Sequence, residues 1–378
     1  MKVAILTYQY PVVSETFVKR HVQKLFGGNT LVLADVPGTQ ADVWVLSQGG
    51  FWNTAGGMRL KWAINLALGR PYNALLFGEQ RRLVQALRDA EVDAVLCEFG
   101  TLSGVLYGVI QNTQLPLFVF FRGYDATSAL RKWQVLDAVK KSVGQAAGVF
   151  AVAQFLLDQL KLKGVHPKRS WVCPSGVDTQ SFLPQPKAPH SLLYVGRFVE
   201  KKQPLLVIRA FAQVLPQHPE AVLTMIGDGP LLAAAQALVE ELGLKGRVQF
   251  LGACGHDVVK VQMAKTAIFL QHSVTASDGN SEGLPSVIQE AMSCECAIVS
   301  TRHAGIPEAV VDGVNGLLVD EHDEQGFARC VAHLLNRPQE QLRMAREARA
   351  HAVAHLDCWA IQSRLEAVIS ALVPQPRQ

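Results

Sequence analysis

Short apolar runs alternate with longer amphipathic stretches along almost the whole chain. The runs lie at 2–6, 30–34, 43–46, 93–97, 117–121 and 148–152, and then at 191–195, 221–226, 248–251, 267–271 and 297–300. Such nearly continuous apolar runs are typical of strands buried on both faces, as in a parallel sheet. The clearest amphipathic stretches between them predict helices and lie at 77–90, 129–144, 203–215 and 230–242. This repeated strand–helix order predicts an α/β protein with doubly wound sheets.

The length of the chain, 378 residues, favours two domains of roughly 150 residues or more each. The best boundary is the segment LPQPKAPH at 183–190, because it is rich in proline and has no periodic apolar pattern. We therefore expect an N-terminal domain over 1–183 and a C-terminal domain over 184–356. Residues 357–378 are expected to form a final segment, whose helix begins after Asp357 as its N-cap.

The composition excludes several classes of protein and of site. Charged residues make up 18% and hydrophobic residues 49% of the chain, which indicates folded domains rather than disorder. The formal net charge of +4 is too small to indicate non-specific binding of nucleic acid. The seven cysteines are scattered and form no Cys-x-x-Cys pair. We therefore expect a reducing, cytoplasmic compartment, with neither a disulfide framework nor a zinc site.

Two stretches bear on targeting and on membranes. The short apolar run at 2–6 is followed by Glu15 without a small-residue cleavage site, which predicts a first strand rather than a signal peptide. Residues 99–121 carry no charge, but the polar residues 111–114 and Pro116 interrupt them. A helix, a turn and a buried strand therefore explain this stretch better than a membrane span does.

The segment SEGLPSVIQEAM, residues 281–292, has the features of an anion site at the start of a helix. It follows a predicted strand and a polar loop, and Pro285 suits the first helical position because it lacks a backbone donor. Amide groups and the helix dipole attract anions at such a helix start. A phosphate is therefore expected beside Gly283, Leu284, Pro285 and Ser286.

Two carboxylates flank this helix start. Glu282 lies just before the helix and Glu290 lies within it, about 12 Å away at most along a helix. This spacing matches a sugar–diphosphate–ribose unit, so one carboxylate could accept hydrogen bonds from sugar hydroxyls and the other from ribose hydroxyls. Two solvated glutamates on a strand–helix turn are the alternative interpretation.

Two further segments supply cations and glycines. GRFVEKK at 196–202 follows a predicted strand, so Gly196, Arg197 and Lys202 are expected at the carboxyl edge of the sheet, where ligands bind in open α/β folds. Two cations suit a diphosphate, although a basic surface loop is an equal alternative. IGDGPL at 226–231 places Gly227 after another strand, which is more often an ordinary turn than a ligand contact.

The order of these segments resembles the family-4 glycosyltransferases. The segments that carry the resemblance are GRFVEKK at 196–202, IGDGPL at 226–231, FLG at 250–252, SEGLPSVIQEAM at 281–292 and STRHAGIPEAVVDGVNGLLV at 300–319. Looser segments in the N-terminal half resemble the branch that builds colanic-acid-like and other exopolysaccharides. They are YPVVSETFV at 10–18, FRGYDAT at 121–127 and CPSGVDTQSF at 173–182.

The resemblance implies a GT-B fold, in which a Rossmann-like acceptor domain over 1–183 and a Rossmann-like nucleotide-sugar donor domain over 184–356 face a cleft. The last helix would cross back to the N-terminal domain. It implies that Arg197 and Lys202 hold the donor diphosphate, that Glu282 contacts the transferred sugar, and that Glu290 contacts the ribose. The backbone of Gly283 and Leu284 would also contact the donor. It implies retention of anomeric configuration, with no metal and no cofactor apart from the nucleotide sugar itself.

Arg122, in the sequence Arg-Gly-Tyr-Asp, stands where the family often has a histidine near the reacting sugar. Arginine cannot act as a base near neutral pH. Retention by same-face attack uses the leaving phosphate as the proton acceptor, so Arg122 could instead stabilise negative charge on that phosphate. Pairing of Arg122 with Asp125 is an equal alternative. The stretch Cys97–Gly100 is a second departure from the family pattern.

Residues 58–68, MRLKWAINLAL, combine cationic and aromatic residues with an apolar face. Such a helix could rest on an anionic membrane, where a lipid-linked acceptor would lie, or it could be an ordinary amphipathic surface helix. His272 and His303 also follow predicted strands, but their patterns favour no catalytic role.

The hypothesis that follows is a retaining glycosyltransferase. It would use a UDP- or GDP-sugar and a saccharide acceptor, most simply a lipid-linked one at the inner face of the cell membrane. A sugar-nucleotide epimerase of the same fold and a nucleotide-sugar-binding subunit without catalysis are the alternatives.

Overall fold

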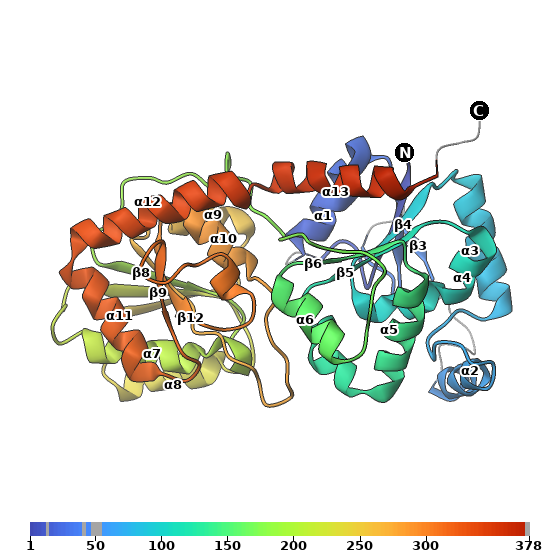
Figure 1. Ribbon diagram of the computed structural model, residues 1–378. Helices are drawn as coiled ribbons and strands as arrows, with labels where there is room; N and C mark the ends of the chain where they lie inside the picture. The colour runs from blue at the N-terminus through green and yellow to red at the C-terminus, as the bar shows by residue number, and fades with distance from the viewer. Residues whose placement is uncertain (13–14, 40–42, 47–54, 375–378) are drawn as a thin grey trace. The chain divides into compact units, whose positions relative to one another are not determined.

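The computed structural model describes residues 1–12, 15–39, 43–46 and 55–374. The chain divides into two compact units: a first unit, Met1–Cys173 with Gln362–Gln378, and a second unit, Pro174–Ile361. Each unit is built on one sheet whose paired strands are all parallel. The predicted α/β class with two doubly wound sheets is therefore confirmed (Figure 1).

The first unit has a seven-stranded sheet in the order β3-β2-β1-β4-β5-β6-β7. Its strands are β1 (Val3–Thr7), β2 (Thr30–Ala34), β3 (Trp44–Val45), β4 (Ala94–Cys97), β5 (Leu117–Phe121), β6 (Gly148–Ala151) and β7 (Ser170–Val172). Strands β1 and β5 are buried along their whole length, as expected for central strands covered on both faces. Strand β7 was not predicted, because an edge strand with Ser170 and Val172 exposed has no continuous apolar run.

Six helices of the first unit are described before its final segment. They are α1 (Thr16–Lys24), α2 (Ala55–Ala67), α3 (Phe77–Asp89), α4 (Tyr107–Thr113), α5 (Trp133–Gln145) and α6 (Gln154–Leu162). The uncharged stretch 99–121 forms the 3-10 helix η3 (Gly100–Leu106), α4 and the buried strand β5, as predicted. Within the described ranges, no helix has both the length and the apolar character that a membrane span requires.

The second unit has a six-stranded sheet in the order β10-β9-β8-β11-β12-β13. Its strands are β8 (Ser191–Val195), β9 (Val222–Ile226), β10 (Val248–Gly252), β11 (Ile268–Leu270), β12 (Ala297–Thr301) and β13 (Gly316–Val319). Helices α7 (Pro204–Val214), α8 (Leu232–Glu241) and α11 (Glu324–Asn336) lie on one face; α9 (His256–Lys265), α10 (Ser286–Ser293) and α12 (Pro338–His355) lie on the other (Figure 1). Large side chains such as Phe211 and Phe327 fill the core between the layers.

The proline-rich segment 183–190 lies within the second unit, whose division from the first falls between Cys173 and Pro174. The backbone N–H groups of Gln185 and Ala188 donate to carbonyls at the end of α9, and the Lys187 ammonium donates to the carbonyl of Ala264. This segment has no periodic apolar pattern because it runs as irregular chain against α9 of the second unit. It is therefore not a free linker between the two units.

The final helix, α13 (Cys358–Leu372), contributes residues to both units. At its start the Asp357 carboxylate accepts hydrogen bonds from the N–H groups of Trp359 and Ala360 and from the Thr179 hydroxyl, consistent with the predicted N-cap. From Gln362 onwards the helix belongs to the first unit, where Glu366 accepts a hydrogen bond from the Phe26 N–H.

Candidate functional site

Four loops leave the carboxyl edge of the sheet in the second unit. They follow β8, β9, β11 and β12, which neighbour one another in the sheet. Because all these strands are parallel, the loops meet at one edge, which is where ligands bind in open α/β sheets. The predicted residues Gly196, Arg197, Lys202, Gly227, Glu282 and Gly283 lie on these loops.

The loops after β8 and β9 are packed too closely for side chains at their contact. Gly227 has a φ of +141°, and a Cβ atom there would lie 1.9 Å from the Gly196 carbonyl oxygen. The Gly196 N–H in turn donates to the Ile226 carbonyl at 2.9 Å. The buried Tyr194 hydroxyl donates to the Arg197 carbonyl at 3.1 Å and fastens the same loop. Glycine at 227 is therefore required by the backbone, whatever else it contacts.

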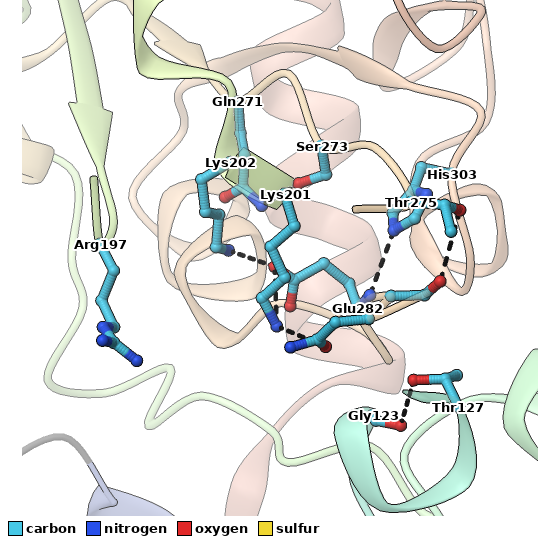
Figure 2. Close-up of polar contacts among 12 residues, drawn as sticks. Gly123, Thr127, Arg197, Lys201, Lys202, Gln271, Ser273, Thr275, Glu282 and His303 are labelled. Carbon is cyan, nitrogen blue, oxygen red and sulfur yellow. Dashed lines mark hydrogen bonds and ion pairs between the residues drawn. The ribbon is translucent and has the colours of Figure 1, made fainter. Parts of the chain in front are cut away.

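Lys201 and Lys202 converge on Glu282 (Figure 2). Their ammonium nitrogens lie 3.6 and 3.1 Å from the same Glu282 carboxylate oxygen. The Lys202 and Glu282 side chains are each only 12% exposed. The structure thus joins the GRFVEKK and SEGLP segments through a largely buried cluster with two cations and one anion.

Burial and charge act in opposite directions on this cluster. Burial by itself would raise the pKa of Glu282, but the positive charges of Lys202 and Lys201 hold that pKa at about 2. Burial lowers the pKa of Lys202, and the Glu282 carboxylate opposes this shift. Because Glu282 loses its proton so readily, the cluster keeps its carboxylate charged at neutral pH.

His303 holds the backbone at Glu282 in place. The Glu282 N–H donates to His303 Nε2 at 3.1 Å, and His303 Nδ1 lies 2.6 Å from a Glu321 carboxylate oxygen. Since Nε2 accepts a hydrogen bond, the proton of the neutral ring lies on Nδ1 and is donated to Glu321. His303 is 1% exposed, so it is a buried positioning group for the loop that carries Glu282.

Helix α10 begins at Ser286, with Pro285 as its N-cap rather than as the predicted first helical residue. The Gly283 carbonyl accepts a hydrogen bond from the Gly305 N–H at 3.0 Å, so the loop after β12 contacts the helix start. Leu284 is 6% exposed and anchors the turn. The helix start thus lies at the same edge as the lysine cluster, as an anion site there requires.

Glu290 is not a solvated glutamate. It is 8% exposed, and its carboxylate lies 3.2 Å from Nε2 of His256, the first residue of α9. The hydrogen bond to Glu290 raises the pKa of His256 above its usual value, although burial opposes the shift. The sequence interpretation missed His256, because nothing in its local pattern indicates a partner in α10.

Arg197 is exposed and lies apart from the lysine cluster (Figure 2). Among the residues that the structure describes, its guanidinium makes no ion pair. The cluster itself therefore has two cations, Lys201 and Lys202, at the carboxylate of Glu282, and Arg197 is a further cation on the loop after β8.

Arg122 belongs to the first unit, at the end of β5, and its guanidinium pairs with Glu98 rather than with Asp125. It lies between the rings of Phe17 and Phe120, with its central carbon 3.8 and 4.0 Å from the two ring centres. The Asp125 carboxylate instead accepts backbone N–H groups, including that of Arg122 at 2.9 Å. The pairing of Arg122 with Asp125, one of the two alternatives drawn from the sequence, is therefore wrong; the other, stabilisation of charge on the leaving phosphate, stays a prediction.

Within the part of the chain that the structure describes, one cluster has the residue types of a metal site. His190, His218 and Glu220 place potential ligand atoms within 4.8 Å of one another. They precede β8 and β9, so they lie at the amino edge of the sheet and not among the loops described above.

Comparisons with known proteins show similarity to glycosyltransferases. Residues 179–351 match the family model described as Glycosyl transferases group 1. A putative colanic acid biosynthesis glycosyltransferase, WcaL of Salmonella typhimurium, is 33% identical over 178 residues, which are 46% of this chain and 44% of that protein. The amylovoran biosynthesis glycosyltransferase AmsK of Erwinia amylovora is 28% identical over 380 residues, which cover 88% of this chain and 90% of that protein. The match to WcaL thus spans less than half of that relative's length.

Solved structures share the fold of the whole chain. HepE of Anabaena, crystallised with UDP and glucose, has a TM-score of 0.79 at 20% identity, covering 98% of this chain and 100% of its own. The lipopolysaccharide outer core galactosyltransferase WaaB has a TM-score of 0.68 at 16% identity, covering 98% and 99%. The chain as a whole therefore has the GT-B fold, and its residues 179–351 match the model of the Glycosyl transferases group 1 family, also called family 4.

Proposed function

We propose that this protein is a retaining, metal-independent glycosyltransferase of cell-surface glycan or exopolysaccharide synthesis. The donor is a UDP- or GDP-sugar, and the acceptor is a saccharide, most simply one linked to a lipid. The observation that carries the proposal is the excess of cations around the buried carboxylate of Glu282, beside the start of α10. The relatives named in colanic acid and amylovoran synthesis support the class of product.

In this proposal the donor lies along the carboxyl edge of the second unit. Arg197 and Lys202 bind the diphosphate, together with the backbone of Gly283 and Leu284. Charge-assisted hydrogen bonds of this kind contribute roughly 1.5–3 kcal/mol each. Glu282 accepts hydrogen bonds from the hydroxyls of the transferred sugar, and its retained charge suits that role because its pKa is about 2.

Glu290 binds the ribose hydroxyls. Its contact with His256 leaves carboxylate oxygen capacity for such a hydrogen bond, because a carboxylate has two oxygens and about four acceptor positions. In this arrangement His256 orients the Glu290 carboxylate and does not take the place of the ribose hydroxyls.

The chemical step needs no protein base. The bond between the anomeric carbon and the phosphate oxygen breaks, and its electron pair goes to the nucleoside diphosphate. The acceptor oxygen bonds to the anomeric carbon from the same face, and its proton passes to the departing phosphate oxygen. Lys202 and Arg197 stabilise the negative charge that grows on this phosphate, which lowers the barrier because the charge is larger in the transition state.

A panel of UDP, GDP and ADP, each free and with several sugars attached, tests the donor class by thermal unfolding. A ligand that binds only the folded protein at about 100 times its dissociation constant stabilises it by about 2.7 kcal/mol. We expect one nucleotide to raise the melting temperature in the wild type and to do so less in Arg197→Ala. Arg209→Ala is a matched control, since Arg209, on α7, pairs with Glu324 at the start of α11. Equal shifts with all three nucleotides would contradict the proposal.

A second measurement separates the proposal from its alternatives. Release of UDP or GDP only in the presence of a saccharide acceptor supports transfer. Isomerisation of the free nucleotide sugar without acceptor would indicate an epimerase. Donor binding with neither reaction would indicate a binding subunit.

A contact with the membrane is part of the proposal. Four large apolar side chains on and after α2, Met58, Leu60, Leu66 and Leu68, are between 42% and 55% exposed, and Arg59 lies among them. An exposed apolar and basic helix is suited to the inner face of an anionic membrane. We expect Leu60→Gln with Leu66→Gln to abolish co-flotation with phosphatidylglycerol vesicles, whereas Leu162→Gln, 77% exposed on α6, does not. Equal flotation of all variants would remove the membrane contact from the proposal.

A further inference from the structure

Three side chains with metal-binding atoms meet at the amino edge of the sheet in the second unit. His190 ends the segment 183–190 and immediately precedes β8, whereas His218 and Glu220 lie in the turn between α7 and β9. One potential ligand atom from each of the three lies within 4.8 Å of the others. The five residues of β8 separate His190 from the loop that carries Arg197, which is about 17 Å along an extended strand. The cluster is therefore remote from the donor site proposed above.

Backbone hydrogen bonds fix the two segments beside this cluster. The Val222 N–H donates to the His190 carbonyl at 3.1 Å, which joins the start of β9 to the residue before β8. The Ala221 N–H donates to the His218 carbonyl at 2.9 Å and closes the turn around Pro219. Because the backbone is held on both sides, the three side chains converge before any ion binds, and little ordering is needed on binding.

The distances within the cluster match those between ligands of one small ion. Nδ1 of His190 and Nδ1 of His218 lie 3.1 and 3.9 Å from the same Glu220 carboxylate oxygen. Around a tetrahedral Zn²⁺ with bonds of about 2.0–2.2 Å, neighbouring ligand atoms lie about 3.3–3.6 Å apart. Small rotations of the side chains therefore suffice to place all three around an ion.

Hydrogen bonding within the cluster does not account for this convergence. Nδ1 of His190 and Nε2 of His218 are both buried atoms without a hydrogen-bond partner among the described residues. The Glu220 oxygen lies close to His190 Nδ1 but is not aligned with it as a hydrogen bond requires, and its distance of 3.9 Å from His218 is too long. Buried polar atoms without a partner are costly. A metal ion would lower this cost, because either ring nitrogen of a histidine can bind it.

The ligand types select the kind of ion. Two imidazoles and one carboxylate are typical ligands of Zn²⁺, whereas Mg²⁺ and Ca²⁺ prefer about six or more oxygen ligands. The His218 side chain is 8% exposed and that of Glu220 is 49% exposed, so the cluster has a buried side and a side open to solvent. A water molecule can therefore supply the fourth ligand.

We propose that His190, His218 and Glu220 bind one Zn²⁺ ion, which fastens the segment 183–190 to the turn between α7 and β9 and stabilises the second unit. The ion takes no part in glycosyl transfer, because it lies at the amino edge of the sheet and the donor lies at the carboxyl edge. The sequence did not predict this site, since His190 is distant in the chain from the other two ligands and no cysteine takes part.

Isothermal titration calorimetry with ZnCl₂ tests the site, on the full-length protein without a histidine tag and after dialysis against a chelator. We expect one Zn²⁺ to bind per chain and to raise the melting temperature, because it binds the folded state. His190→Asn and Glu220→Gln should each weaken binding at least about tenfold, since each removes a ligand and even the loss of an outer-shell partner costs about 10- to 100-fold. Asparagine tolerates the positive φ of 56° at position 190, so this variant should fold.

His351→Ala is the matched control. His351 and His355 lie one turn apart on α12, with ring centres 4.8 Å apart, and such a pair could attract Zn²⁺ at the surface. We expect the control to bind Zn²⁺ as the wild type does, and MgCl₂ to give no binding.

Four results would overturn the inference. They are no Zn²⁺ binding by the wild type, unchanged affinity in both His190→Asn and Glu220→Gln, loss of binding in His351→Ala, and binding of Mg²⁺ as tight as that of Zn²⁺. The nucleotide panel is run without Zn²⁺, so the donor proposal stands or fails independently of this site.

Discussion

Each of the two units contains a deeply buried glutamate near the carboxyl edge of its sheet, but the two glutamates have different surroundings. In the first unit Glu98, fully buried, is matched by Arg122 and by His21 at 2.6 Å, and aromatic rings cover the arginine. In the second unit Lys201 and Lys202 both contact Glu282. Arg197, on the same loop as the two lysines, is exposed. The pKa of each carboxyl is about 2, because nearby cations outweigh burial in both.

The difference indicates which glutamate is free to bind a ligand. The side chains of Glu98, Arg122 and His21 are all buried, and their contacts connect α1 to the ends of β4 and β5. Around Glu282 the cations exceed the anion, and the cluster borders an exposed edge. A similar pKa therefore accompanies an internal structural bond in one unit and the proposed donor site in the other.

The largest expected effect is on folding and comes from Glu98→Gln. The change leaves Arg122 buried without its counter-charge, which should lower the free energy of unfolding by about 3–5 kcal/mol at pH 7. Because the folded pKa of Glu98 lies below its unfolded value, its stabilisation is present above about pH 4.5 and is lost as the pH falls through about 2. Urea unfolding at several pH values measures the deficit, which should shrink in acid.

Asp137→Asn is the control for Glu98→Gln, since Asp137 forms a surface pair with Lys141 that should contribute less than about 1 kcal/mol. Similar losses from the two changes would remove the structural role assigned to the Glu98 cluster.

Lys202→Ala should act mainly on the reaction, since Lys201 remains beside Glu282 as a counter-charge. We expect kcat to fall about 100- to 1,000-fold, as for the loss of one group that stabilises transition-state charge. Steady-state kinetics with the donor found by thermal shift measures this. Lys201→Ala, whose ammonium is farther from Glu282, should lose less. A loss confined to the donor KM would make Lys202 a binding group only.

Glu290→Gln should raise the donor KM about tenfold with kcat nearly unchanged, since it removes a contact made equally in the ground and transition states. Glu324→Gln, on the opposite face of the same sheet, is the control. If the donor KM does not respond to Glu290→Gln, the ribose assignment is wrong and the pair with His256 is purely structural.

The smallest effect concerns the last helix. Asp357→Ala removes the N-cap of α13 and its bond to Thr179, and should lower the free energy of unfolding by about 1 kcal/mol. Thermal unfolding measures this, with Asp158→Ala on α6 as a control expected to cost less. A loss as large as that of Glu98→Gln would mean that the two units depend on α13 far more than the cap alone explains.

The fold could be predicted because its signals are local. Buried parallel strands appear as continuous apolar runs, and the runs at the centre of both sheets were found. Strands β7 and β13 lie at the sheet edges and were not predicted, since exposure interrupts the apolar pattern of β7 and β13 is a short segment inside a glycine-rich motif.

The partners within the site were harder to predict, because they are distant in sequence. Asp125, three residues from Arg122, is one of the two alternatives that the sequence offers for Arg122, yet its carboxylate accepts hydrogen bonds from the backbone N–H groups of Gly100, Arg122 and Gly123. The strand order of the sheet brings Glu98 to Arg122 instead. The contacts of His256 with Glu290 and of His303 with Glu321 likewise depend on which loops the fold makes adjacent.

The shared helix α13 has a consequence for the order of events at the ribosome. Leu365 and Ile369 are buried, and they belong to the first unit although the whole second unit precedes them in the chain. The second unit can therefore complete most of its core during synthesis, while the first, begun earlier, keeps an apolar surface uncovered until residues 362–372 emerge. Truncation before these residues should consequently harm the unit that was made first, and chaperone dependence should be greatest for the N-terminal part of the nascent chain.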